Sequence, residues 1–124
     1  MEIIATPDAP QAIGPYSQGV KHHGILYTSG QIALDPATGK LVEGDFAAQV
    51  HRVFRNLAAI LQAAGSDFSR VLKANVYLTD LENFGTLNGI YAEYFGDHKP
   101  ARTTIGVAEL PKESAVEIDL IALT

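Results

Sequence analysis

Arg102 and Glu117 are the two residues whose types and places best suit chemistry on a small acid. Arg102 follows the turn Pro100-Ala101 and opens a run rich in β-branched residues, so we expect its guanidinium at the entrance of a strand. A guanidinium fixed there offers a planar fork of donors that binds a carboxylate or phosphate through two hydrogen bonds. The competing interpretation is a surface arginine in an ordinary salt bridge.

These two charges stand on the last two expected strands, residues 102–109 and 115–123, which a short loop joins. Such a loop predicts an antiparallel hairpin. Pairing Glu109 with Ala115 puts Arg102 opposite position 122, about 17 Å from Glu117. The two charges then cannot share a small substrate within one chain, but they can share one across a symmetric subunit interface.

Other arrangements that carry chemistry are missing from the sequence. It has no glycine-rich phosphate loop, no serine in a nucleophile elbow and no histidine or carboxylate cluster at metal-binding spacing. The histidines His22, His23, His51 and His98 do not converge, and we interpret them as surface residues. We therefore expect neither a metal nor a cofactor.

Two helices and several strands must position these residues. One helix is predicted from an Asp45 cap to a stop at Gly65, and a second from an Asp80 cap to Gly96. Alternating residues predict strands at 2–5, 20–30 (turning at His23-Gly24), 71–79, 102–109 and 115–123. This order predicts one α+β domain over residues 1–124, with two helices on one face of a largely antiparallel sheet.

Composition limits the class of protein. The chain has 124 residues, a net charge of −5 and no cysteine, which excludes disulfides and counts against a broad nucleic-acid surface. No leader peptide or membrane-length apolar run is visible, so we expect a cytoplasmic protein without membrane contact. The final strand carries Glu117, Asp119, Ile121 and Leu123 on one face, and this mixed face predicts contact with another subunit.

Several motifs in the same order along the whole chain resemble those of the RidA group, also called the YjgF group. They are Ile13-Gly14-Pro15-Tyr16-Ser17-Gln18, Ser29-Gly30-Gln31-Ile32, Asp35-Pro36-Ala37-Thr38-Gly39, Asn75-Val76-Tyr77-Leu78, Asn88 with Tyr91-Ala92-Glu93-Tyr94-Phe95, Pro100-Ala101-Arg102, and Leu110-Pro111 with Val116-Glu117-Ile118-Asp119-Leu120-Ile121-Ala122.

This resemblance implies a chorismate-mutase-like (ferredoxin-like) α+β fold and a homotrimer with sites between subunits. It also implies hydrolysis of 2-iminobutanoate and 2-iminopropanoate to 2-oxo acids and ammonia, without a cofactor. The imines are by-products of pyridoxal-phosphate-dependent threonine and serine dehydratases, which would link the protein to those enzymes.

The resemblance also implies roles for single residues. Arg102 binds the substrate carboxylate, and Glu117 holds the attacking water and accepts its proton as a general base. Backbone groups of Gly30 and Thr104 position the imine nitrogen and the water. The remaining pocket residues are Tyr16, Ser29, Phe84 and Asn88. Many members of the group carry a cysteine where this chain has Thr104, so a thiol cannot be essential here.

Two other functions remain open. A non-catalytic module that binds 2-oxo acids or similar small carboxylates would need Arg102 but would gain nothing from the anion of Glu117. A ribonuclease that inhibits translation is a lesser alternative, because the acidic balance and the lack of paired catalytic histidines count against RNA cleavage.

Overall fold

Helix α1 (Phe46–Ala63) forms the long element on which the core is built. The Asp45 carboxylate caps its first turn by accepting a hydrogen bond from the Ala48 N–H at 3.0 Å, as the sequence predicts. Its apolar side chains recur every three or four residues and pack on the sheet. Seven of its side chains are buried: Val50, Val53, Phe54, Asn56, Leu57, Ile60 and Leu61.

Helix α2 (Phe84–Phe95) starts later than the sequence suggests. Asp80 caps a short 3₁₀ turn at Leu81–Asn83, accepting from the Glu82 N–H at 2.9 Å, and the α-helix begins only after that turn. Phe84, the first residue of the α-helix, is 37% exposed. The helix ends at Gly96, whose φ of 60° lies in the left-handed region.

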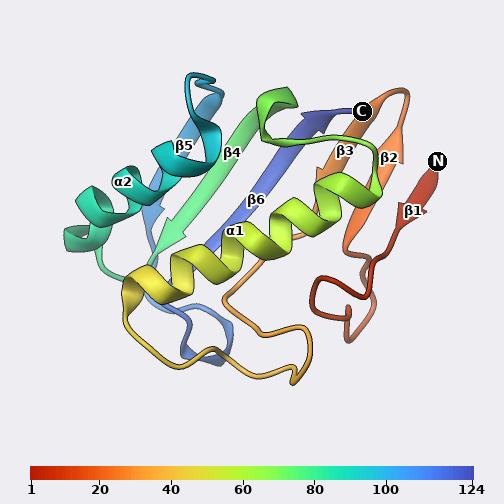
Figure 1. Ribbon diagram of the computed structural model, residues 1–124. Helices are drawn as coiled ribbons and strands as arrows, with labels where there is room; N and C mark the ends of the chain where they lie inside the picture. Colours follow the sequence, from red (N-terminus) through yellow and green to blue (C-terminus); the bar gives the residue numbers. More distant parts are fainter.

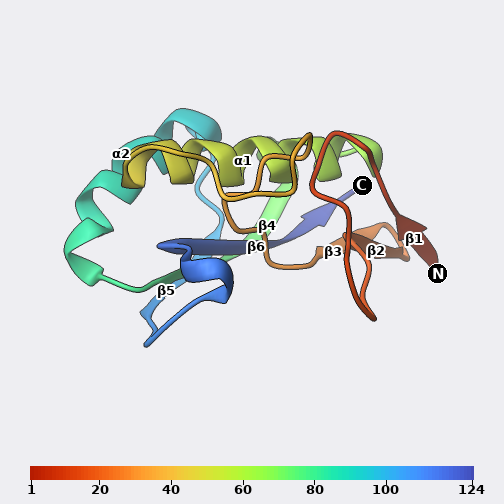
Figure 2. The same cartoon turned by 90° about the horizontal axis from the view of Figure 1, so that it is seen from below.

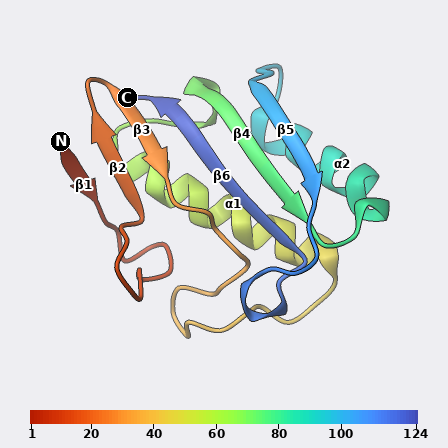
Figure 3. The same cartoon turned by 180° about the vertical axis from the view of Figure 1, so that it is seen from behind.

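Six strands form one sheet, described here over residues 1–124 of the computed structural model. They are β1 (Glu2–Ile4), β2 (Gly19–His22), β3 (Ile25–Thr28), β4 (Val71–Leu78), β5 (Ala101–Gly106) and β6 (Val116–Leu123). Their order across the sheet is β1-β2-β3-β6-β4-β5, which Figure 3 shows from behind. Only the β4–β5 pair is parallel, so the largely antiparallel sheet that the sequence predicts is confirmed.

The predicted antiparallel hairpin of the last two strands is wrong. β5 pairs in parallel with β4, while β6 lies between β3 and β4. Parallel neighbours need a crossover of about a dozen residues or more, and the segment that contains α2 supplies it. Val116, Ile118, Leu120 and Ala122 are almost completely buried, a burial that β6 achieves in the middle of the sheet and would not achieve at its edge.

Both α-helices cover the same face of the sheet, and no α-helix covers the other face (Figures 1 and 2). The side chains of β6 alternate between these environments: the even-numbered ones enter the core, and Glu117, Asp119, Ile121 and Leu123 face the open side. This is the chorismate-mutase-like α+β arrangement predicted from the sequence. None of its helices has the length and apolar character needed to cross a membrane.

Candidate functional site

Glu117 stands on the open face of the sheet, at the start of the central strand β6. Its carboxylate borders a cavity of about 860 Å³ that Tyr16, Ser29, Gly30 and Lys112 also line. The segment 29–31 reaches this place because Gln31 continues the line of β3 and bonds to β6, its N–H donating to the Ile118 carbonyl at 2.9 Å. Four of the predicted site residues therefore meet at one cavity.

The loop that precedes β2 holds Ser29 and contains Tyr16. The Ser29 N–H donates to the Gln18 carbonyl at 2.9 Å, and the Ser29 hydroxyl donates to the Ser17 carbonyl. Gln18 is buried and bonds in turn to the loop carbonyls of Thr6, Ala9 and Pro10. Tyr16 is 54% exposed at the mouth of the cavity. The cavity thus has a fixed inner wall and an aromatic side chain at its rim.

Negative charge and burial together set the electrostatics around Glu117. Its carboxylate forms no ion pair and no hydrogen bond within the chain, whereas the nearby Asp119 accepts one from the Asn75 amide at 2.8 Å. Burial, and to a lesser extent the charge of Asp119, raise the pKa of Glu117 above its ordinary value. The same surroundings raise the pKa of Tyr77, the register partner of Glu117 on β4. A carboxylate of this kind is suited to accept a proton.

Arg102 lies at the other site, between the edge strand β5 and helix α2. Its Nη1 donates to Asn88 Oδ1 at 2.7 Å, and its Cζ lies 4.8 Å from the centre of the Tyr91 ring and 5.4 Å from that of Phe84. The only carboxylate within 4.0 Å of a basic side chain is that of Glu93, beside His51, so no carboxylate neutralises Arg102. A fixed guanidinium with unused donors has the chemistry to bind an anion.

Two hydroxyl groups beside Arg102 are buried without a hydrogen-bond partner: Oη of Tyr91 and Oγ1 of Thr104. They are the only such side-chain atoms in the chain. Thr104 lies two residues along β5 from Arg102 and so shares its face of the strand. Burial raises the pKa of Tyr91, while the neighbouring charge of Arg102 acts in the opposite direction. Unpartnered buried hydroxyls are rare and destabilising; here one is on the residue whose ring packs on Arg102 and the other is on the strand that carries Arg102.

Arg102 and Glu117 point to opposite faces of the sheet. Arg102 is in register with Ala74 of β4 and, through it, with the core residue Leu120, whereas Glu117 is in register with Tyr77. Strand and residue spacings put them about 10 Å apart across the sheet and about 10 Å apart along it. The predicted position opposite residue 122 is wrong because no hairpin forms, but the two charges still cannot meet on one small ligand within a chain.

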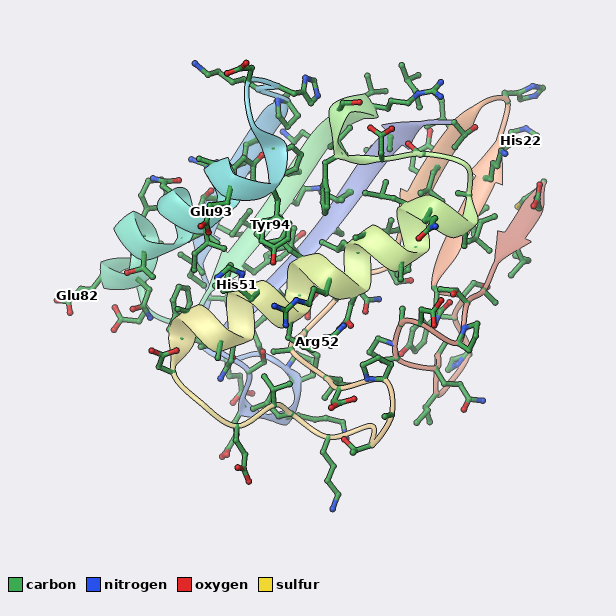
Figure 4. All side chains as sticks on the ribbon, in the orientation of Figure 1. His22, His51, Arg52, Glu82, Glu93 and Tyr94 are labelled. Carbon is green, nitrogen blue, oxygen red and sulfur yellow. The ribbon has the colours of Figure 1, made fainter.

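The histidines do not form a site with either charge. His51 Nδ1 lies 2.8 Å from the Tyr94 hydroxyl and His51 Nε2 lies 4.0 Å from Glu93, where α1 meets α2; His22 lies at the far end of the molecule (Figure 4). His98 Nε2 contacts the Val71 carbonyl at 2.6 Å. No three histidine or carboxylate side chains gather closely enough to hold a metal ion. A second hollow of about 590 Å³, beside β1, has no charged residue in its wall.

Two residues of these sites were not predicted as site residues from the sequence. Tyr91 is a buried residue of α2, and nothing in the spacing of that helix indicates that its ring packs on a guanidinium. Lys112 lines the Glu117 cavity with a backbone φ of 55°, a left-handed conformation that the sequence does not indicate for lysine. Its only signal is its place after Leu110-Pro111, a motif that the sequence does single out.

Comparison with known proteins identifies the family. Residues 6–124 match the family model described as endoribonuclease L-PSP. The chain is 48% identical over 122 residues to the mouse 2-iminobutanoate/2-iminopropanoate deaminase, covering 98% of this chain and 90% of that one. It is also 48% identical to a putative regulator, AldR, of Lactococcus lactis, covering 98% and 97%.

A solved structure gives the same result. The crystal structure of RidA from an Antarctic Psychrobacter superposes with a TM-score of 0.96 at 44% identity, and the match covers all of both chains. Sequence and fold therefore agree over the full length of the protein. The chain belongs to the RidA family, to which the endoribonuclease L-PSP model also assigns it.

Proposed function

We propose that this protein is a deaminase that hydrolyses 2-imino acids such as 2-iminobutanoate and 2-iminopropanoate to 2-oxo acids and ammonia. The observation that carries the proposal is the pair of complementary charges: an arginine without a carboxylate partner and a half-buried carboxylate with a raised pKa. A 2-imino acid offers an anion for the first and an electrophilic carbon beside it for the second. The identity to a mammalian deaminase supports this choice of substrate.

Arg102 would bind the substrate carboxylate. Asn88 and the rings of Phe84 and Tyr91 hold the guanidinium in one orientation, so little side-chain freedom is lost when the ligand binds. Because Asn88 uses its amide oxygen on Arg102, its NH₂ group is left to donate to the ligand. The backbone of Thr104 lies on the same edge strand and would position the imine or the water.

Glu117 would accept and donate the protons that move during hydrolysis. In the first step its carboxylate takes a proton from water as the water oxygen bonds to C2 of the protonated imine, giving a carbinolamine. Glu117 then returns this proton to the amino nitrogen. The C–N bond breaks, ammonia leaves, and the hydroxyl proton passes to Glu117 as the C2=O bond forms. The departing ammonia takes this proton from Glu117 and leaves as ammonium, so the carboxylate ends ionised, as it began, and water is the only co-reactant.

A complete site would need two copies of the chain. The open face of the sheet carries Tyr27, Ile105, Ile121 and Leu123, an apolar set that a neighbouring copy would cover. In a cyclic trimer the Glu117 cavity of one copy would meet the Arg102 site of the next. Sedimentation at micromolar concentration should give a trimer, and a stable monomer would contradict this arrangement.

Mixing two inactive variants tests the shared site directly. We expect Arg102→Ala and Glu117→Gln to be inactive alone. After refolding together in equal amounts, random assembly leaves about a quarter of the sites with both native residues, so about a quarter of the wild-type activity should return. If mixed trimers form and no activity returns, the two charges do not work across subunits.

The activity itself is tested by supplying the imine as it forms. Purified threonine dehydratase and threonine generate 2-iminobutanoate, and the protein should accelerate its loss and the release of ammonia. Glu117→Gln serves as the control, because it keeps the fold and lacks the base. A rate equal to that in buffer would contradict the deaminase proposal.

A second candidate is a sensor that binds 2-oxo acids without turnover, and the likeness to the putative regulator AldR favours it. Such a protein would bind 2-oxobutanoate with Arg102. The substitution Glu117→Gln would change neither its affinity for 2-oxobutanoate nor its behaviour in the coupled assay. Calorimetric titration of 2-oxobutanoate beside the coupled assay separates the two functions. Binding without any imine hydrolysis would select the sensor.

A further inference from the structure

Gly30 approaches Glu117 more tightly than any other glycine of the chain approaches its neighbours. A Cβ built on Gly30 would lie 2.3 Å from Glu117 Oε2 and 2.8 Å from its Cδ. The next tightest case, Gly44, would place its Cβ 2.9 Å from the Ala48 methyl group. The Glu117 carboxylate thus occupies the space where residue 30 would otherwise carry a side chain.

The backbone does not require glycine at this position. Six other glycines of the chain have φ in the left-handed region, and Gly30 is not one of them. Gln31 is fixed by its bonds to Ile118 whatever residue precedes it. An alanine at position 30 is therefore compatible with the local backbone, and only the Glu117 side chain stands in its way.

Glu117 has nothing else within the chain to hold it there. No donor bonds to its carboxylate. The charged or titratable groups around it are Asp119 and Tyr77 on the sheet, Lys112 at the cavity wall and Tyr16 at the cavity rim. Asp119 repels the carboxylate, and Lys112 forms no ion pair with it. Packing against Gly30 remains as the contact that fixes the carboxylate at the inner wall of the cavity.

We propose that Gly30 is a positioning residue for Glu117: the space left by its missing side chain holds the carboxylate where it meets the attacking water. This role rests on the proposed deaminase function and adds to it a requirement on side-chain size at position 30. Even one methyl group would push the carboxylate out toward the cavity. The contribution of Gly30 would then be steric, distinct from any hydrogen bond that its backbone makes.

A double-mutant cycle tests the proposal in the coupled assay. Gly30→Ala should lower kcat by about 10- to 100-fold with KM changed less than threefold, because only the general base is displaced. Glu117→Asp should also lower kcat. The double variant should be more active than Gly30→Ala alone, because aspartate is one methylene shorter and leaves room for the methyl group. Gly85→Ala, whose added Cβ meets nothing within 4 Å, is the matched control and should keep full activity.

If the loss of kcat in the double variant equals the product of the losses in the two single variants, Gly30 and Glu117 act separately. That result would overturn the proposal. Thermal unfolding of each variant identifies any general loss of structure. Unchanged kcat in Gly30→Ala would also overturn it.

A readout that does not depend on catalysis separates this inference from the proposed function. Carbon-13 NMR of protein labelled at glutamate carboxyl groups, assigned with Glu117→Gln, follows the titration of Glu117. In Gly30→Ala its pKa should fall toward the ordinary value, because the displaced carboxylate is better hydrated. An unchanged titration would show that the carboxylate does not move. If the wild type hydrolyses no imine but the titration shifts, the deaminase proposal fails and the steric role of Gly30 stands.

Discussion

The two charged sites of this protein are built in opposite ways. Arg102 is held by a hydrogen bond from its own side chain to Asn88 and by two aromatic rings, whereas Glu117 has no partner and lies in a space left by a glycine. A rigid guanidinium suits a binding role, since its geometry is the same before and after the ligand arrives. A carboxylate free of donors keeps its basicity, because no hydrogen bond stabilises its ionised form. Binding and proton transfer can therefore be altered separately.

Removal of Arg102 should have the largest effect. Arg102→Ala deletes a desolvated, charge-assisted pair worth about 2–5 kcal/mol, so 2-oxobutanoate affinity should fall by about 30-fold to several thousand-fold. Turnover of the imine should become undetectable. Arg102→Lys should recover little, because an ammonium group lacks the planar fork.

The exposed Arg55 of α1 gives the matched control, and Arg55→Ala should bind 2-oxobutanoate as the wild type does. Calorimetry on all three variants measures the effect. Affinity in Arg102→Ala within threefold of the wild-type value would show that another group binds the carboxylate.

Removal of the base should affect turnover and leave binding nearly intact. Glu117→Gln should lower kcat by about 10²- to 10⁴-fold, as expected for loss of a general base. The affinity for 2-oxobutanoate should stay within a few fold or rise, because a nearby negative charge is removed. The coupled assay and calorimetry on one preparation measure both. Wild-type turnover in this variant would mean that catalysis rests on positioning by Arg102 and backbone groups.

The contrast between local and long-range signals explains what the sequence could predict. Helix α1 was predicted with its cap at Asp45 and its stop at Gly65, because periodicity and capping are encoded within a few residues. The partners of β5 and β6 were predicted wrongly, because pairing depends on burial across the whole sheet. Two features are nevertheless consistent with the observed pairing. The alternate residues of β6 are apolar and completely buried, as in a central strand, and segment 79–100 is long enough for a parallel crossover.

The same contrast applies to the sites. The residue types Arg102 and Glu117 were identifiable from their places beside turns and on strands, but the face to which each side chain points follows from the strand order. The space at Gly30 arises from contact between segments far apart in the sequence, and no spacing rule indicates it. The contact of Tyr91 with Arg102 is hidden within an apolar stripe for the same reason.

A smaller change, Asp119→Asn, should tune the basicity of Glu117 without removing it. Glu117 must be ionised to accept a proton, so kcat/KM should fall at low pH as Glu117 becomes protonated. Because the pKa of Glu117 is raised, this acid limb should lie at higher pH than for an ordinary glutamate. Asparagine removes the charge that contributes to this shift and leaves the burial, so the limb should move to lower pH. Rates over a pH series measure the change. A limb that stays in place or moves to higher pH would contradict the assignment of that limb to Glu117.

The hydroxyl of Tyr91, whose ring packs on Arg102, should contribute least. Tyr91→Phe removes a buried hydroxyl that has no partner and keeps the ring against Arg102, so the free energy of unfolding should rise by about 1 kcal/mol. Tyr94→Phe is the matched control on the same helix: its hydroxyl lies 2.8 Å from His51 Nδ1, and its loss should lower the free energy of unfolding by about 1 kcal/mol. Urea denaturation measures both. If both variants lost stability equally, the Tyr91 hydroxyl would have a partner in the assembled protein, and the ring that packs on Arg102 would then be fixed by a hydrogen bond.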